Sequence, residues 1–119
     1  MKVLRDVLPK LLAEQQPQLV MYNAGVDVHG EDQLGKMALT NQGIHERDHF
    51  VLSSCAHANV PVAAAIGGGY QTDHAHIVER HMSLHRCALD LLPVFLSGRD
   101  ALRRGRHSPG MLAVERDML

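Results

Sequence analysis

Two glycine-rich segments contain the side chains best suited to chemistry. Residues 24–39 show no helical or strand period, and they hold three glycines and four acidic or histidine side chains, namely Asp27, His29, Glu31 and Asp32. The second segment is the run Gly67-Gly68-Gly69, directly followed by Tyr70. Long ordered loops often carry function. A single Asp in such a loop is nevertheless most often a turn residue, and a Tyr after glycines is most often a packed ring, so the residues taken singly favour a structural role.

The histidines and cysteines are weaker signals. His45 and His49 are four residues apart, as are His81 and His85, and two imidazoles at this spacing on a helix can bind one metal ion. We interpret both pairs as solvated helix faces. Two cysteines, at positions 55 and 87, have no spacing typical of a metal or redox site, so we expect both to remain reduced thiols.

Three helices are predicted to position these segments. Apolar residues recur every three or four positions over residues 3–16, which is the pattern of an amphipathic helix. A second helix follows the cap residue Thr40 and ends just before Asn59, a residue suited to the position after a helix. A third helix is expected over residues 73–92, with Pro93 ending it.

Two short apolar runs, Leu19–Asn23 and Val60–Ile66, are predicted to be strands buried on both faces of a parallel sheet. Strands that alternate with helices are typical of an α/β fold, in which ligands bind beyond the carboxyl ends of the strands. Both glycine-rich segments follow directly after these strands. An ordinary sheet has about 5–6 strands, so a sheet of two leaves both edges open and indicates part of a larger sheet.

The motifs together resemble a known family. The segment from Tyr22 to Gly35 reads YNAGVDVHGEDQLG, and it is followed by Leu39-Thr40, by Glu46-Arg47-Asp48 and, later, by Gly67-Gly68-Gly69-Tyr70-Gln71. In this order the motifs resemble the C-terminal part of the zinc-dependent histone deacetylase and acetylpolyamine amidohydrolase superfamily. The beginning and the end of the pattern are most similar to class IV histone deacetylases and their bacterial relatives. The resemblance covers roughly residues 4 to 90.

The resemblance implies a fold and a division of the chain. The fold would be α/β, a partial arginase-deacetylase-type parallel sheet with flanking helices, representing the C-terminal third to half of the whole. Residues 1–96 would then be the C-terminal part of a histone deacetylase-like domain. Residues 97–119, which include a basic stretch from Arg99 to Arg106, are predicted to form a mobile tail.

The resemblance also implies roles for individual residues. Asp32 would be a ligand of the catalytic zinc, and the hydroxyl of Tyr70 would donate a hydrogen bond to the acetyl carbonyl oxygen as that oxygen gains negative charge. Gly67, Gly68 and Gly69 would border the channel of the extended substrate, because a backbone without Cβ allows close approach. Asp27 and His29 are placed near the mouth of the site, with metal ligation as the less favoured alternative.

Part of the family's active site is absent from the sequence. The family requires a His-His pair and an earlier Asp-x-His loop, and this chain contains no His-His pair. We therefore expect zinc not to be retained by the chain alone, and the isolated chain to be inactive. The expected function by family is zinc-dependent hydrolysis of acetyl-amides, on acetyl-lysine or an acetylpolyamine. The alternative is a non-catalytic remnant or interaction module that pairs through its exposed sheet edges with a missing N-terminal portion or with a second copy.

Composition excludes other classes. The 119 residues carry a net charge of −1, with 45% apolar and 21% charged residues, which is typical of one soluble globular domain and gives no field to attract nucleic acid. Polyanion binding by the basic tail is a minor alternative, because no aromatic residues accompany the arginines. No apolar run is long enough to cross a membrane, and the charged first residues do not resemble a signal peptide, so a cytoplasmic location is expected.

Overall fold

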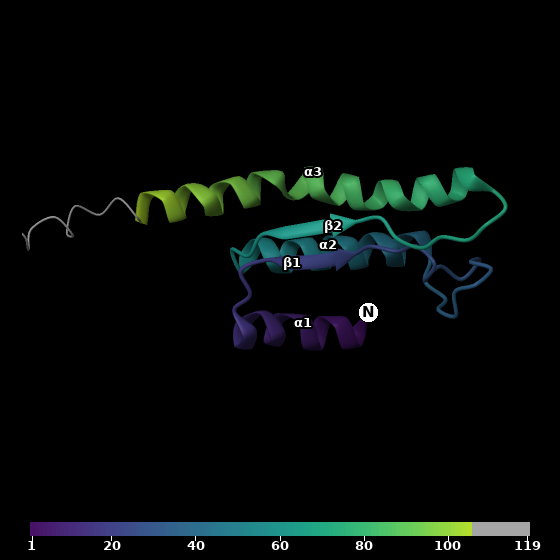
Figure 1. Cartoon of the computed structure of the whole chain (residues 1–119), viewed down its shortest axis with the longest axis horizontal. Helices are drawn as coiled ribbons and strands as arrows, with labels where there is room; N and C mark the ends of the chain where they lie inside the picture. Colours follow the sequence, from purple (N-terminus) through teal and green to yellow (C-terminus); the bar gives the residue numbers. More distant parts are fainter. Residues whose placement is uncertain (106–119) are drawn as a thin grey trace, which may run out of the picture.

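The computed structural model describes the backbone of residues 1–105 and the side chains of residues 1–98. Its elements follow one another in the order α1 (Lys2–Gln15), β1 (Val20–Asn23), α2 (Asn41–His57), β2 (Val62–Ala65) and α3 (His74–Gly105) (Figure 1). None of the helices in this part of the chain is both long and apolar enough to cross a bilayer.

The ends of α2 agree with the sequence prediction. The side chain of Thr40 accepts the backbone N–H of Gly43 at 3.1 Å, which satisfies one of the free donors at the start of the helix. At the other end, Asn59 has a φ of 54°, the left-handed conformation that commonly follows a helix and that asparagine tolerates better than most residues. Local sequence therefore sets both ends of α2.

The two strands pair in parallel, as predicted, with Val20 opposite Val62 and Asn23 opposite Ala65. The α/β class is confirmed by this pair and the crossover helix α2 between its strands. Both strands are shorter than the apolar runs that predicted them.

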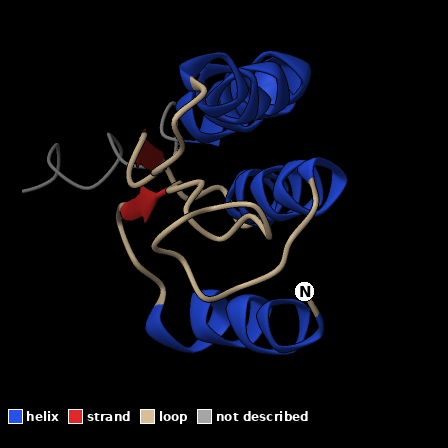
Figure 2. Cartoon of the chain, turned by 90° about the vertical axis from the view of Figure 1, so that its right-hand side faces the viewer, coloured by secondary structure: helices blue, strands red, loops and turns tan. Residues whose placement is uncertain are grey.

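The expectation that both faces of the sheet are buried is wrong for this chain. All three helices lie on one side of the two strands (Figure 2). Along β1 burial alternates, and Met21 on the other face is 75% exposed. Its partner in register, Ala63, is exposed as well.

The core lies between the covered face of the sheet, α2 and α3. Its buried members are Ala24, Leu52, Leu84, Cys87 and Leu91, with Tyr22, Val62, Val94 and Phe95 packed against them. Helix α1 contributes little, since Leu12 is its only buried residue. The core therefore fixes β1, β2, α2 and α3 against one another, and with them the loops at the carboxyl ends of the strands.

The prediction that Pro93 ends the third helix is wrong. A proline inside a helix costs about 3 kcal/mol, because it has no N–H to donate and its ring crowds the preceding turn. Here Leu91 before it and Phe95 after it both contact the core, so apolar burial on both sides favours a continuous helix. The carbonyl that loses its donor belongs to Leu89, which is 69% exposed and can be hydrated.

The predicted boundary at residue 96 does not coincide with a break in secondary structure, since α3 continues to Gly105. The helix therefore includes the first nine residues of the predicted tail, 97–105. The remainder of that tail, residues 106–119, lies outside the described residues.

Candidate functional site

The two glycine-rich segments meet at one edge of the sheet. Because β1 and β2 are parallel, their carboxyl ends lie side by side, and pairing continues past the strands with Ala24 N–H donating to Ala65 O at 2.8 Å. Val26 and Asp27 N–H then both donate to Gly68 O, at 2.6 and 3.2 Å. The loop of residues 24–39 and the turn of residues 67–70 are therefore one hydrogen-bonded unit.

Asp32 joins the two segments through its side chain. Its Oδ2 accepts the backbone N–H of Tyr70 at 2.7 Å, and its Oδ1 accepts those of Leu34 and Gly35 at 2.9 and 2.7 Å. Partial burial acts to raise the pKa of this carboxyl, but the three N–H donors outweigh it and hold the pKa below the ordinary value of 3.8. The structure thus brings together the two residues that were assigned the metal and oxyanion roles, and it gives Asp32 a structural task within the site.

Asp27 is the other carboxylate of the site. Among the described side chains it has no hydrogen-bond or ion-pair partner, and its Oδ2 contacts the position that a Cβ on Gly68 would occupy. The ring of Tyr70 approaches that same position, with Cε2 at 3.1 Å. The Asp27 carboxylate and the Tyr70 ring therefore flank Gly68, and Tyr70 is 47% exposed.

The glycines of the site are required by close packing. A Cβ at Gly67 would collide with the side chain of Asn23, and one at Gly69 would lie 2.8 Å from Val26 Cγ2. At Gly35 the conflict is with the backbone carbonyl of Asp27, which cannot shift unless the loop shifts with it. Contact with neighbouring parts of the chain explains these glycines without a ligand, and their place along a substrate channel stays a prediction.

His29 lies inside the loop and is 8% exposed. Its Nδ1 lies 3.1 Å from the backbone N–H of Glu31 and accepts from it, which leaves the proton of the neutral ring on Nε2. Burial, together with the nearby Arg80 guanidinium, lowers the pKa of His29 below 6.5. This hydrogen bond and the backbone pairing of Val28 and Gly30 with Leu39 give His29 a role in loop structure.

A buried ion pair between Arg47 and Asp48 of α2 supports the site. Asp48, on α2 and 1% exposed, accepts a hydrogen bond from Tyr22 Oη at 2.6 Å and pairs with Arg47 at 2.8 Å. The Arg47 Nη1 in turn donates to Gly25 O at 2.6 Å. Burial, and then the hydrogen bond to Asp48, raise the pKa of Tyr22, so its hydroxyl remains a donor. This network anchors the end of β1 to α2.

Two charged residues that support the site were given no role from the sequence. Asp48 stands in the apolar row Ile44, Asp48, Val51 and Cys55 of α2, and Arg80 stands in the row Ile77, Arg80, Leu84, Cys87 and Leu91 of α3. Both rows have the three- and four-residue spacing of a buried helix face. A charged residue at such a position must be paired inside the protein, and this pattern is the signal that identifies it.

The interpretation of the histidine pairs as solvated faces is wrong for one member of each. His45 Nδ1 lies 3.4 Å from both Ser83 Oγ and Cys87 Sγ, and Nδ1 of His81 is buried without a partner among the described residues. His45 and His49 also enclose a glutamate in the His-Glu-x-x-His pattern of zinc peptidases. Their ring centroids are 6.3 Å apart, and Glu46 bonds Arg5 and Gln42, so the described side chains supply no third ligand beside them.

Residues 1–98 do not by themselves fit a complete metal centre, since their side chains include no group of three or more His, Cys, Asp or Glu that could hold an ion. Closed zinc sites take four ligands, and catalytic ones take three from the protein. A zinc ion at Asp32 or Asp27 would therefore need ligands from outside this described part.

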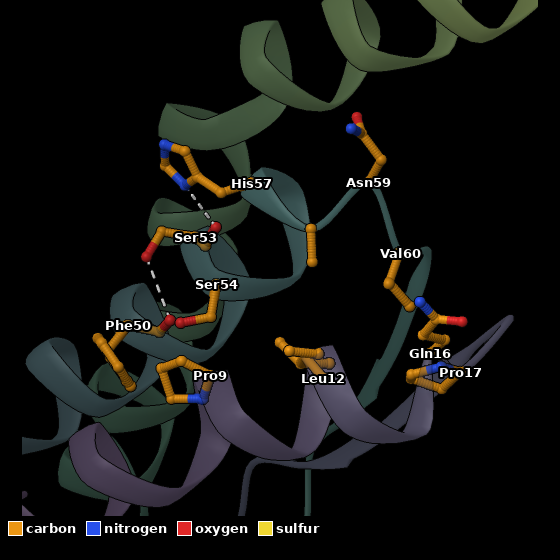
Figure 3. A pocket seen from close by; sticks show the side chains of 12 residues that line it. Pro9, Leu12, Gln16, Pro17, Phe50, Ser53, Ser54, His57, Asn59 and Val60 are labelled. Atoms are coloured by element: carbon orange, nitrogen blue, oxygen red, sulfur yellow. Dashed lines mark hydrogen bonds between the residues drawn. The ribbon is translucent and has the colours of Figure 1, made fainter.

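Two hollows are relevant to the site. One of about 620 Å³ lies at the outer side of the turn and is lined by Gln33, Leu34, Tyr70, Thr72, His74 and Ile77, among others. A larger hollow of about 830 Å³ lies between α1 and the C-terminal half of α2 (Figure 3). The residues lining it include Pro17 and Val60, which precede the strands, so it is at the opposite end of the sheet from Asp32 and Tyr70.

The amino-acid sequence of the chain matches a family profile and several known proteins. The profile of the histone deacetylase domain matches residues 1–85. A protein of Picosynechococcus sp. that is itself described as uncharacterized is 47% identical over 91 residues, which are 76% of this chain and 30% of that protein. Histone deacetylase 2 of Arabidopsis thaliana is 36% identical over 63 residues, which are 53% of this chain and 16% of that protein. The chain therefore spans less than a third of the length of these curated relatives.

Proposed function

Because the chain belongs to the histone deacetylase family, we propose that it forms one wall of a site that hydrolyses an acetyl-amide on lysine or a polyamine. The observation that carries the proposal is the bond of 2.7 Å between Asp32 Oδ2 and Tyr70 N–H. It joins two segments 38 residues apart in the sequence, at the carboxyl ends of neighbouring parallel strands, where ligands of α/β proteins bind.

Each of the three polar residues has a distinct task in this proposal. Tyr70 is half exposed at the sheet edge, and its hydroxyl donates to the amide carbonyl oxygen as negative charge develops there. Asp32 orients Tyr70 by holding its backbone. Asp27 has no hydrogen-bond or ion-pair partner among the described residues, and its carboxylate contacts a group from outside, either a cation or the substrate. One oxyanion donor of this kind contributes about 10²–10³ in rate.

The remaining parts of the reaction must come from elsewhere. The family is generally zinc-dependent, but the described side chains of this chain do not form a metal centre, and we assign no step to a metal here. The sequence also has no His-His pair to transfer the proton from the attacking water. We therefore propose that a complementing segment completes the site, and that this chain alone does not turn over acetyl-lysine.

Complementation tests the proposal. The chain is mixed with the portion of the Picosynechococcus relative that it does not match, and hydrolysis of an acetyl-lysine peptide is measured in the presence of zinc. We expect activity only in the mixture, and a loss of about 10²-fold or more in kcat with Tyr70→Phe. Arg86→Gln is the control, since the exposed guanidinium of Arg86 on α3 bonds exposed Glu79 and no residue of the site edge. A mixture that is active and insensitive to Tyr70→Phe would refute the oxyanion role.

A second candidate function, an interaction module, is favoured by the uncovered apolar surface. Met21 on the open face of the sheet is 75% exposed, and Leu19, just before β1, is 52% exposed. Val3 and Val7 of α1 are 74% and 43% exposed. Within the described residues each strand also has one unpaired edge, which can add a strand from another chain. Sedimentation distinguishes the candidates: a module of this kind self-associates, and Met21→Glu restores the monomer.

A further inference from the structure

Arg80 is the most deeply buried cation among the described side chains, and it bonds the side chains of three other residues. Its side chain is 4% exposed, in the core-facing row of α3. The guanidinium donates to Glu31 Oε2 at 2.7 Å, to Asn41 Oδ1 at 3.1 Å and to Gln71 Oε1. All three bonds are side-chain to side-chain contacts across 9 to 49 residues of sequence.

Two of the three partners of Arg80 are sequence neighbours of Asp32 and Tyr70, and the third, Asn41, begins α2. Glu31 precedes Asp32, and Gln71 follows Tyr70. These two partners also bond each other, because Gln71 Nε2 donates to Glu31 O at 3.1 Å. One buried guanidinium therefore contacts the neighbours of both residues that form the bond between Asp32 and Tyr70.

We propose that Arg80 is a positioning residue of the site, which holds the turn of Tyr70 against the loop of Asp32 through Gln71 and Glu31. Its catalytic consequence rests on the function proposed above, whereas its effect on geometry does not. Arginine suits the task because its planar fork can serve several acceptors in a fixed arrangement. A lysine would supply the charge, but it cannot reproduce the fork.

Hydrogen exchange tests the positioning directly, without any need for activity. We expect Arg80→Gln to accelerate exchange of the Tyr70 amide about tenfold or more relative to the amides of β1 and α2. In the wild type, local opening of the turn must break the charged hydrogen bonds of Arg80, and in the variant these bonds are absent, so the turn opens more often. Arg80→Lys should give an intermediate rate. The matched control is Arg86→Gln on the same helix, where an exposed guanidinium bonds exposed Glu79 at 2.9 Å; this change should leave the Tyr70 amide as it is.

Two further variants protect the test against misfolding of Arg80→Gln. Glu31 is exposed and Gln71 is half-buried, so Glu31→Gln and Gln71→Ala each remove one arm of the network with little loss of core packing. Each should accelerate exchange of the Tyr70 amide. If that amide keeps its wild-type rate in these variants, or if all amides accelerate equally, Arg80 only stabilises the fold and the proposal is overturned.

Kinetics of the complemented enzyme provide the second readout. We expect Arg80→Gln to lower kcat with little change in KM, since the acetyl-amide still enters but meets a misplaced Tyr70 hydroxyl. Should the wild-type mixture be inactive while the exchange result holds, the proposed function fails and the positioning by Arg80 stands. Unchanged kcat in an active mixture would instead count against Arg80 alone.

Discussion

The carboxylate of Asp32 accepts the backbone N–H of Tyr70 at 2.7 Å, although the two residues are far apart in the sequence. The same carboxylate also closes its own loop by accepting from Leu34 and Gly35. A single side chain therefore sets both the shape of the loop and the place of the tyrosine. A change in the charge of this carboxylate should therefore alter the position of Tyr70 more than the packing of the core.

Replacing Asp32 by Asn should loosen the Tyr70 turn. The amide has one acceptor oxygen in place of two, so it cannot serve both Oδ1 and Oδ2 partners. We expect faster hydrogen exchange at the Tyr70 amide, measured by NMR. Asp73→Asn is the control, because Asp73 also accepts a backbone N–H, that of Ala75 at 2.9 Å, but at the start of α3.

Acid should reproduce the effect of Asp32→Asn. The folded pKa of Asp32 lies below its ordinary value of 3.8, so the ionised form stabilises the loop fully above that value, and this contribution is lost as pH falls through the folded pKa. Protection of the Tyr70 amide should therefore decrease below about pH 4. Protection that persists in acid would show that the N–H of Tyr70 has another acceptor.

Gly35→Ala should disrupt the loop, whereas Gly30→Ala should be tolerated. A Cβ at Gly35 would overlap the backbone carbonyl of Asp27, which can only move if the loop moves. At Gly30 the nearest atom, Ala38 Cα, is at an ordinary contact distance of 3.5 Å. NMR shifts of residues 24–39 should change widely in the first variant and locally in the second. Equal responses would contradict the packing described for this loop.

Tyr22→Phe should destabilise the fold by about 1.5–3 kcal/mol, the usual contribution of a hydrogen bond to a charged group. The lost hydroxyl donates to buried Asp48, which among the described residues would keep only Arg47 as a partner. The free energy of unfolding in urea measures the change. Tyr70→Phe, at an exposed site, should alter stability little, and a reversed order of the two variants would contradict the network.

His81→Leu should make the protein less sensitive to mild acid. Burial lowers the pKa of His81 below 6.5, although the carboxylate of Asp48 acts in the other direction while Arg47 and His85 reinforce the decrease. The neutral ring is thus compatible with the fold above pH 6.5, and stability decreases as pH falls through the folded pKa. Leucine removes both the titration and the unpartnered Nδ1. The slope of the unfolding free energy between pH 7 and 5 should decrease, and His85→Leu on the exposed face is the control.

Zinc binding by the isolated chain should be weak. The described side chains bring no three ligands together, and the rings of His45 and His49 on α2 lie close to each other, with centroids 6.3 Å apart. Calorimetric titration with zinc should therefore show low affinity that falls with His49→Ala and not with Asp32→Ala. Stoichiometric submicromolar binding that disappears with Asp32→Ala would refute this, and would establish the carboxylate loop as a metal site in its own right.

The sequence by itself determined the order of the elements, the parallel pairing of the strands and the two segments that form the candidate site. These follow from local signals: apolar periodicity, the Thr40 cap, the Asn59 helix end and the glycine runs. Parallel strands then require that the segments after them meet at one edge. That Asp32 and Tyr70 are close is therefore a consequence of topology, which the alternation of helices and strands already implies.

Only the tertiary structure decided which side-chain atoms of the candidate site form hydrogen bonds within the protein. Asp32 and Asp27 are both acidic residues in one loop, and their spacing does not distinguish them. The structure shows that the carboxylate of Asp32 accepts three backbone hydrogen bonds, whereas the carboxylate of Asp27 accepts none from the described residues. The continuation of α3 through Pro93 depended on core contacts on both sides of the proline. The partners of Arg80 come from three separate segments, which only the tertiary structure brings together. In each case the outcome is set by partners brought together in space, whose free energy exceeds the local preference.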